Sequence, residues 1–356
     1  MRKLDRYVGR SVLLAMTVVL LALGGLDFLF TVFEELGDTE GSYDTAAALR
    51  YVLFTFPRHV YELLPMTALI GALVGLGMLA AGNELVALQA AGITRMRIVG
   101  AVLQPTLLVI LAGLVLGEYV APRLEVRGET GKALASGEQV ALSRYGHWER
   151  DGEAFMHFNA IEPDGVLYGV NLFVFDARQR MVRTVSAERA VYAGADWRLE
   201  NGTEFAFTHG ANGVSGTRSD FDTQRWELDL TPDLLQVLIV DPDRMAISDL
   251  YRYAQRFERQ GQDADAYYLA FWKKALQPVT TLVLVLLAIS FIFGPLRQTT
   301  MGLRLFTAIC FGLTFTILQN LLHTLSLVYR FEPLVAVVLP LLGCALLGLM
   351  LFRRAA

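Results

Sequence analysis

Six long apolar runs constrain the fold of this chain more than any other feature of its sequence. The runs are Ser11–Phe33, Leu63–Ala81, Ile98–Gly117, Ala275–Leu296, Leu305–Leu327 and Pro333–Phe352. The first contains Asp27, whereas the other five contain no aspartate, glutamate, lysine or arginine. About 20 apolar residues in a helix cross the hydrocarbon core of a bilayer, which is about 30 Å thick. The sequence therefore predicts six membrane-spanning helices, three on each side of a long polar insert.

The polar insert has the pattern of an antiparallel β structure. We expect residues 1–122 to form the first three helices, residues 123–271 the insert and residues 272–356 the last three helices. Turn signals such as Asp151-Gly152 and Asn201-Gly202 supply the positive φ that tight hairpins need. They separate short β-like runs: Ala154–Phe158, Val166–Phe175, Ala187–Tyr192, Thr203–Thr208 and Arg225–Leu230. This spacing is typical of a sandwich, a jelly roll or an open barrel.

Two segments of the insert carry further signals. Val166–Phe175 is nearly all apolar, so it is either a strand buried on both faces or a strand that lines a groove for an acyl chain. After Pro242 the pattern becomes helical, with Ser248 as a suitable N-cap and Gly261 as a suitable stop. We expect this helix to lead the chain back to the membrane.

Lysine and arginine are distributed unevenly among the segments that connect the apolar runs. They gather in both tails and in two short loops, at Arg2, Lys3, Arg6, Arg10, Arg95, Arg97, Arg297, Arg304, Arg353 and Arg354. The segment after the first run is acidic instead, with Glu34, Glu35, Asp38, Glu40 and Asp44. Because cytoplasmic loops carry the excess of basic residues, we expect both termini in the cytoplasm and the insert outside. Lys273 and Lys274 lie on the outer side against this rule and are therefore candidates for a functional role.

The sequence motifs of common catalytic and energy-converting sites are absent. Lys132 follows Gly131, but no glycine lies five positions before Gly131, so the phosphate-binding loop of nucleotide hydrolases is not formed. The five histidines show no metal-ligand spacing, and a net charge of −4 provides no basic footprint for nucleic acid. We therefore expect a chain that is not an enzyme and that holds neither a metal nor a cofactor.

The carboxylates beside the apolar runs are misplaced for a proton relay, which needs acids near the bilayer midplane. Asp27, Glu62 and Glu118 all lie close to the outer ends of the predicted helices. They either reach the outer interface individually or form a polar rim around an outward-opening cavity. If the protein moves a substrate uphill, the energy must come from another protein.

The loop after the second apolar run predicts a short helix that is bounded at both ends. Asn83 is a suitable N-cap, Glu84 complements the helix dipole and Gly92 suits the C-terminal stop. Leu85 and Leu88 share one face of this helix. It either lies on the membrane surface or docks in a groove of a cytoplasmic ATPase, with Glu84 meeting a basic residue.

Several motifs distributed along the chain carry a specific resemblance to a known family. They are Leu4–Tyr7, Gly41–Asp44, Leu64–Leu73, Glu84–Val86, Ala91–Arg95, Gly117–Pro122 and Ser290–Arg297. With these motifs the chain resembles the LptF/LptG (YjgP/YjgQ) family of lipopolysaccharide export permeases, and most of all its G-type members. The resemblance covers essentially the whole chain, although the insert matches by pattern more than by motif.

The resemblance implies a complex in the inner membrane of Gram-negative bacteria that serves outer-membrane biogenesis. The partners would be an LptF-like permease, an LptB-like ATPase dimer that binds ATP and Mg²⁺, and an LptC-like protein with a single span and a jelly roll. The insert would be a periplasmic antiparallel β-jelly roll, and lipopolysaccharide would enter a cavity between the two permeases. The residues that couple to the ATPase would be Asn83, Glu84, Leu85, Leu88, Gly92 and Arg95.

The same resemblance suggests residues that contact lipopolysaccharide. Arg58 and Lys132 match two basic positions that face the substrate phosphates in the family. At a third position this chain has Glu129, with Arg123 and Arg127 nearby, so Lys273 or Lys274 would supply the charge instead. Acyl chains would bury against Phe28, Phe30, Leu69 and Leu73. The lateral gate would form between the first helix and the fifth helix of the partner permease.

Two other classes of function account for the same layout of helices and insert. One is a proton-driven export factor of the SecD/SecF type, which needs midplane carboxylates and has its large outer domain after the first helix. The other is a scaffold that crosses the envelope without transport. Co-purification with an ATPase distinguishes the permease from both.

Overall fold

The structure, a computed structural model, describes most of the chain in two compact units. It describes residues 2–37, 43–135, 147–151, 154–158, 160–162, 166–176, 178, 180–194, 196–210, 213–226, 241–259, 263–296 and 299–355. The helical unit comprises Met1–Gly37, Val52–Glu125 and Pro242–Ala356. The insert unit comprises Asp38–Tyr51 and Val126–Asp241.

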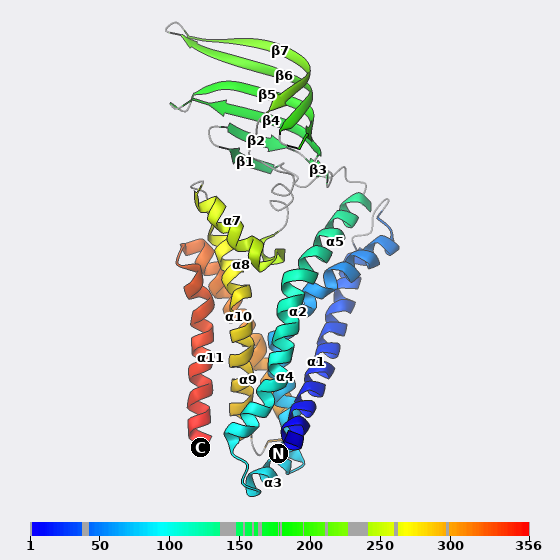
Figure 1. Cartoon of the computed structure of the whole chain (residues 1–356), viewed down its shortest axis with the longest axis vertical. Coiled ribbons are helices and arrows are strands. Elements are labelled where there is room, and N and C mark those ends of the chain that lie inside the picture. Colours follow the sequence, from blue (N-terminus) through cyan, green and yellow to red (C-terminus); the bar gives the residue numbers. More distant parts are fainter. Residues whose placement is uncertain are drawn as a thin grey trace. The chain divides into compact units, whose positions relative to one another are not determined.

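Long helices dominate the described part of the chain (Figure 1). They are α1 (Arg2–Gly37), α2 (Thr45–Ala81), α3 (Glu84–Ala90), α4 (Arg95–Val115), α5 (Ala121–Ala135), α7 (Ile247–Arg259), α8 (Asp265–Ala275), α9 (Gln277–Phe293), α10 (Met301–Tyr329) and α11 (Pro333–Ala355). A π-helical turn, Leu116–Val120, joins α4 to α5. Within the described residues, five helices are long and apolar enough to cross a bilayer, and a sixth span results if α8 and α9 are counted together. The six apolar runs of the sequence fall on these spans.

The fourth span is broken where α8 meets α9 at a bend of 48°. Pro278 lies in the first turn of α9. Its ring has no N–H to donate and clashes with the carbonyl four residues earlier, so α8 cannot continue straight into α9. The apolar run predicted the position of this span, but it did not predict the bend.

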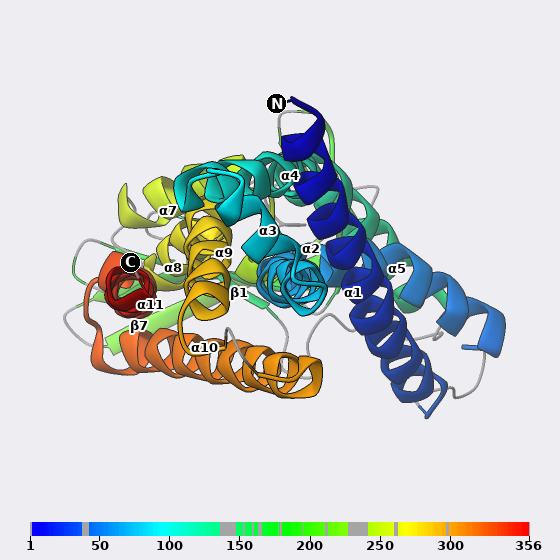
Figure 2. The same ribbon diagram turned by 90° about the horizontal axis from the view of Figure 1, so that it is seen from below.

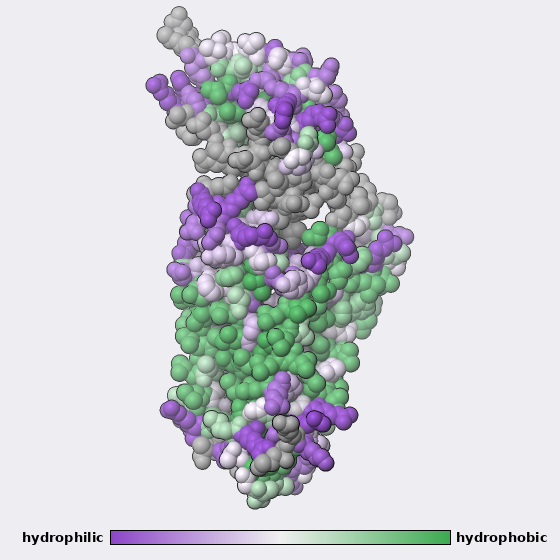
Figure 3. Space-filling model, in the orientation of Figure 1, coloured by the Kyte–Doolittle hydropathy of each residue, from purple (hydrophilic) through white to green (hydrophobic). Residues whose placement is uncertain are grey.

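The middle of the helical unit exposes apolar side chains, and hydrophilic residues gather toward its two ends (Figure 3). Large exposed side chains include Leu21, Leu111 and Ile317, which are 71%, 63% and 67% exposed. Soluble proteins rarely expose contiguous apolar areas of this kind. A band of apolar surface around spans of this length is the expected surface for contact with lipid.

Two glycines allow α1 and α2 to pack closely (Figure 2). A Cβ atom at Gly71 would lie 2.5 Å from the Cα atom of Met16, and one at Gly75 would lie 2.8 Å from the Cα atom of Val12. Small residues at this spacing let the backbones of membrane helices approach each other. The core of the helical unit is built around this contact.

The insert unit contains one antiparallel sheet. Its described strands are β1 (His147–Asp151), β2 (Ala154–Phe158), β3 (Ala160–Glu162), β4 (Val166–Phe175), β5 (Met181–Tyr192), β6 (Trp197–Gly210) and β7 (Gly213–Trp226). They pair in the order β1-β2-β4-β5-β6-β7, and β3 pairs with β4. The predicted antiparallel insert between the third and fourth spans is therefore confirmed. Apart from β3, the order is that of a meander, because each strand pairs with the next one along the path.

A line of irregular residues crosses the four longest strands. It runs through Gly169, Glu188, Asn201 and Asp222, whose neighbours on both sides are paired although these four are not. Gly169 and Asn201 have φ values of +62° and +52°. As a result, two residues of one strand that flank this line point into the same core although they are three positions apart and not two. Leu167 and Val170 of β4 are an example. Such irregularities bend strands, so we attribute the curvature of the long strands to this line (Figure 1).

The core of the insert is a cluster of buried side chains on this sheet. Leu167, Val170 and Leu172 of β4 are buried in it, together with Trp197 and Trp226. The residues between them on β4 are only partly buried. β4 is therefore a core strand with one buried face and one partly buried face, so the alternative of burial on both faces is wrong and the acyl-chain groove stays a prediction.

Two local predictions in the insert and its exit are wrong. Asn201-Gly202 lies inside β6 and not in a hairpin turn, because its positive φ serves the irregular line described above. Ser248 is the second residue of α7 and not its N-cap. The backbone N–H of Ile247 instead donates to the Glu118 carboxylate at 2.8 Å, so a side chain from another helix satisfies the helix start. The predicted stop at Gly261, the acidic residues Asp38 and Glu40, and Arg297 lie outside the described residues.

Candidate functional site

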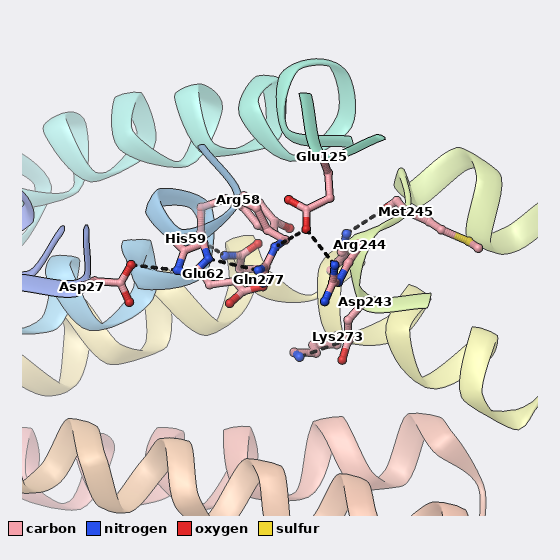
Figure 4. Close-up of polar contacts among 12 residues, drawn as sticks. Asp27, Arg58, His59, Glu62, Glu125, Asp243, Arg244, Met245, Lys273 and Gln277 are labelled. Atoms are coloured by element: carbon pink, nitrogen blue, oxygen red, sulfur yellow. Dashed lines mark hydrogen bonds and ion pairs between the residues drawn. The ribbon is translucent and has the colours of Figure 1, made fainter. Parts of the chain in front are cut away.

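A network of charged side chains lies at one end of the helical unit (Figure 4). Arg58 of α2 pairs with Glu62 at 2.9 Å and with Glu125 of α5 at 3.1 Å. Glu125 also pairs with Arg244 at 3.3 Å, and its side chain is 0% exposed. Two guanidinium groups and two carboxylates thus neutralise one another. Arg58 lies at the predicted outer end of its span, but its charge is already balanced by two carboxylates.

The three carboxylates predicted at outer helix ends have polar partners within the helical unit. Asp27 of α1 lies 2.8 Å from the Nδ1 atom of His59. Glu62 pairs with Arg58, and Glu118 accepts a hydrogen bond from Ile247. Of the two alternatives for these acids, the polar rim agrees better with these contacts than separate contacts with the interface do.

A cavity of about 240 Å³ lies beside this network, between α2, α8, α9 and α10. Its charged lining residues are Glu62, Asp243, Lys273 and Lys274, and its neutral polar lining comes from Gln277, Thr280, Thr316, Gln319 and Asn320. Polar groups within membrane spans are rare and usually mark a substrate path. The cavity is slightly smaller than the range of about 300–1,000 Å³ for whole small-molecule sites. Its size and lining suit part of a charged, hydroxylated headgroup.

The two lysines of this cavity are held differently. Lys273 pairs with Asp243 at 3.2 Å, and its side chain is 34% exposed. Lys274 is 7% exposed, and its Nζ atom donates to the carbonyl of Met245 at 2.5 Å. Lys273 is thus the lysine that can turn toward a ligand, whereas Lys274 fixes the segment that enters α7.

Lys132 belongs to a separate cluster in the insert unit. Its Nζ atom lies 5.6 Å from the ring centroid of Tyr43 and 4.8 Å from that of Tyr51. The Tyr51 hydroxyl donates to Glu129 at 3.0 Å. A cation above an aromatic face is attracted by the ring, so Lys132 has a structural role in this arrangement. Arg123 and Arg127 are exposed.

The predicted acyl-chain contacts divide into two groups. Leu69 and Leu73 are 0% exposed and pack inside the helical core. They present no surface to an acyl chain in this structure, and Leu69 lies beside α10, where a Cβ atom at Gly312 would be 3.5 Å from its side chain. Phe28 packs edge-on against Phe56 with ring centroids 5.3 Å apart, and Phe30 is 66% exposed. On α1, Phe30 is accessible and Phe28 is partly buried, whereas both leucines on α2 are covered.

The predicted short helix lies at the other end of the helical unit, the end that carries both chain termini (Figure 1). Gly92 has a φ of +84°, the N–H of Ile93 donates to the carbonyl of Leu88, and the N–H of Gly92 donates to that of Gln89. These bonds are those of a Schellman motif, so Gly92 ends α3 as expected. Asn83 does not act through its side chain; it adopts a left-handed conformation with φ of +59°.

The apolar face of α3 points inward. Leu85 is 4% exposed, and Leu88 packs against the same core. These residues fix α3 to its own helical unit, in which Leu85 is covered and Leu88 is partly buried. Val86 is 48% exposed, and Asn83, Ala87 and Ala90 are exposed as well. The amphipathic pattern predicted the helix, but it could not reveal which protein its apolar face packs against.

Further side chains position α3 and its neighbours. The Glu84 side chain is hydrogen-bonded to that of Tyr7 on α1. Arg97 donates twice to Asp5, at 3.1 Å each, and thereby joins α4 to α1. Arg95 lies over the ring of Phe293 at 5.8 Å. The sequence alone does not reveal these pairs, nor Glu125 and Arg244, because the partners are far apart in the chain and no spacing relates them.

Known proteins match the chain along nearly its full length. The family model for the lipopolysaccharide export system permease LptF/LptG matches residues 6–354. The lipopolysaccharide export system permease protein LptG of Escherichia coli K12 is 36% identical over 360 residues, which cover 99% of this chain and 98% of the relative. The protein of the same name from Haemophilus influenzae Rd is 33% identical over 342 residues, which cover 95% and 94%. The chain belongs to the LptF/LptG family of lipopolysaccharide export system permeases, and these relatives are of its G type.

Proposed function

We propose that this chain is the G-type permease subunit of an ATP-driven machine that moves lipopolysaccharide from the inner membrane toward the outer membrane. The observation that carries this proposal is the family match across both helix groups and the insert. A multi-pass membrane protein of this family is a transport component. The basic residues at the end that carries both termini support a cytoplasmic location for that end and a periplasmic location for the insert.

The energy enters through α3 in this proposal. A cytoplasmic LptB-like ATPase dimer binds ATP and Mg²⁺, and this chain itself needs no cofactor. The ATPase contacts the exposed side of α3, formed by Val86, Ala87 and Ala90, and a basic residue of the ATPase meets Glu84. Because Leu85 and Leu88 pack into the helical core, a displacement of α3 acts directly on the bundle.

The substrate path follows from the accessible groups. An LptF-like permease completes the cavity, with a lateral gate between α1 and the partner's fifth span, and an LptC-like protein continues the path. The acyl chains contact α1 near Phe28 and Phe30. A headgroup phosphate meets Lys273 beside the polar cavity, and Arg123 and Arg127 provide further exposed cations. Arg58 stabilises the charged network through Glu62 and Glu125, and Lys132 stabilises its own cluster through Tyr43 and Tyr51.

Charge reversal at Glu84 tests the coupling. We expect the variant Glu84→Arg to bind the ATPase at least about ten-fold more weakly, because like charges at an interface cost several kcal/mol and each 1.4 kcal/mol is ten-fold. Co-purification of the ATPase and ATP-dependent release of lipopolysaccharide from proteoliposomes measure the effect.

The control for this test is Glu332→Arg, which makes the same change at an exposed residue next to α11. It should retain the ATPase. If the ATPase fails to co-purify even with the unaltered chain, a proton-driven factor or a scaffold replaces this proposal. Unchanged binding by Glu84→Arg would contradict the role of α3.

A further inference from the structure

An apolar groove lies on the helical unit away from the polar cavity. It has a volume of about 370 Å³ and lies between α4, α9 and α11. Its lining includes Met96 of α4, Leu286 and Leu287 of α9, and Ala345 and Phe352 of α11. Ser290 is the only lining residue with a polar side chain other than a thiol among the described residues, and its hydroxyl donates to the carbonyl of Leu286. The groove therefore has no polar side chain left to recognise a polar ligand.

The size of the groove restricts what it can hold. α4 and α11 both pack along α9, which forms the floor between them. Ala345 and Gly348 add little bulk on the α11 side, and a Cβ atom at Gly348 would lie 3.6 Å from the Cα atom of Leu287. A helix with its side chains is about 10–12 Å wide and needs more room than 370 Å³. A single hydrocarbon chain fits both the volume and the apolar lining.

Basic side chains follow directly at one end of the groove. Arg353 and Arg354 come after the lining residue Phe352 on α11, and both are exposed. Met96, on the opposite wall, is the second residue of α4 and is 70% exposed. This end of the groove is thus the end of the helical unit that carries the termini, where a headgroup would meet the two arginines. Anionic headgroups attract basic residues next to a membrane span.

We propose that this groove binds one acyl chain of an anionic phospholipid, whose phosphate is held by Arg353 and Arg354. The phospholipid comes from the leaflet at the end that carries both termini. The site shares no lining residue with the polar cavity and includes none of α3, so it does not depend on the export function. Bound lipid would fix α11 against α9 and α4.

Titration of the purified complex with phosphatidylglycerol or phosphatidylcholine, followed by native mass spectrometry, tests this site. Ala345→Phe fills the groove, and Leu346→Phe adds the same ring at a neighbouring residue that is 61% exposed. We expect Ala345→Phe to weaken binding of phosphatidylglycerol on the order of ten-fold, since about two displaced methylene groups are sufficient for that loss. Leu346→Phe should bind like the unaltered protein.

The arginines test the headgroup contact separately. The change of Arg353 or Arg354 to Gln should reduce the preference for phosphatidylglycerol over phosphatidylcholine about five-fold for each residue. Binding of phosphatidylcholine should not change. Met96→Trp blocks the groove from α4 and repeats the test if Ala345→Phe fails to fold.

Three results would overturn the proposal. Equal affinities of the groove-filling variants and Leu346→Phe for phosphatidylglycerol would show that lipid binds elsewhere. If the groove-filling variants lose co-purified lipopolysaccharide but keep phospholipid, the groove has a different occupant. An unchanged preference in both arginine variants would show that the headgroup is not recognised. A failure of export in any assay leaves these lipid measurements interpretable, because none of them depends on transport.

Discussion

Glu125 is the residue on which the polar network depends most. Its side chain is 0% exposed and lies between Arg58 and Arg244, whereas Glu62 is 45% exposed and pairs with Arg58 alone among the residues that the structure describes. Removing one partner of a buried ion pair costs about 3–5 kcal/mol because the other charges remain buried. A surface pair contributes only about 0–1 kcal/mol. Loss of Glu125 should therefore destabilise the fold much more than loss of Glu62.

The paired variants Glu125→Ala and Glu62→Ala test this difference. We expect Glu125→Ala to lower the free energy of unfolding by about 3 kcal/mol or more. Glu62→Ala should lower it by less than about 1 kcal/mol. Thermal unfolding in detergent, followed by tryptophan fluorescence, gives both values. Equal losses would show that Glu125 is not the centre of the network.

At this scale, the sequence predicted the position of Arg58 but not its partners. A basic residue before an apolar run indicates a membrane edge, so a phosphate contact was a reasonable hypothesis. Glu125 lies 67 positions away from Arg58, and no sequence pattern relates the two. The pairing becomes visible only when α2, α5 and the segment before α7 are brought together.

Among the elements, the close packing of α1 against α2 depends on glycines, which have no side chain, at their contact. We expect Gly71→Ala to destabilise the protein by about 1–3 kcal/mol, because its Cβ atom would lie 2.5 Å from a backbone atom of Met16. Gly343→Ala is the matched control, since nothing lies within 4 Å of a Cβ atom at that residue. Thermal unfolding in the same detergent compares them. Similar midpoints would mean that α1 and α2 pack less tightly than the structure shows.

Sequence patterns predicted elements well where the signal is local. Gly92 predicted the end of α3 because a positive φ favours glycine. Asn83 and Asn201 show the limit, since both have positive φ. Asn83 occupies the N-cap position of α3 but makes no side-chain cap hydrogen bond, and Asn201 lies inside a strand. Asparagine tolerates this conformation in several settings, so the motif could not tell a helix cap or hairpin from an irregular strand. Likewise, an apolar face on α3 predicts burial but not its partner.

For the whole molecule, the number of spans determines the topology. Six spans place both termini on one side of the membrane, whereas five place them on opposite sides. The described helices allow either number, because α8 and α9 form one span only if they are counted together. Within the helical unit, both termini lie at the same end (Figure 1), and the arginines near them support the even number.

Single cysteines in a variant that lacks Cys310 and Cys344 can decide between these topologies. We expect a small membrane-impermeant maleimide, added to intact cells, to label Glu332→Cys but neither Lys3→Cys nor Arg354→Cys. All three residues are exposed, so labelling after the membrane is disrupted controls for reactivity. Labelling of only one of the two terminal cysteines in intact cells would mean that α8 and α9 do not cross the bilayer together. The groove beside α11 would then meet a different leaflet from that of α3, and the two ends of the export path would need to be reassigned.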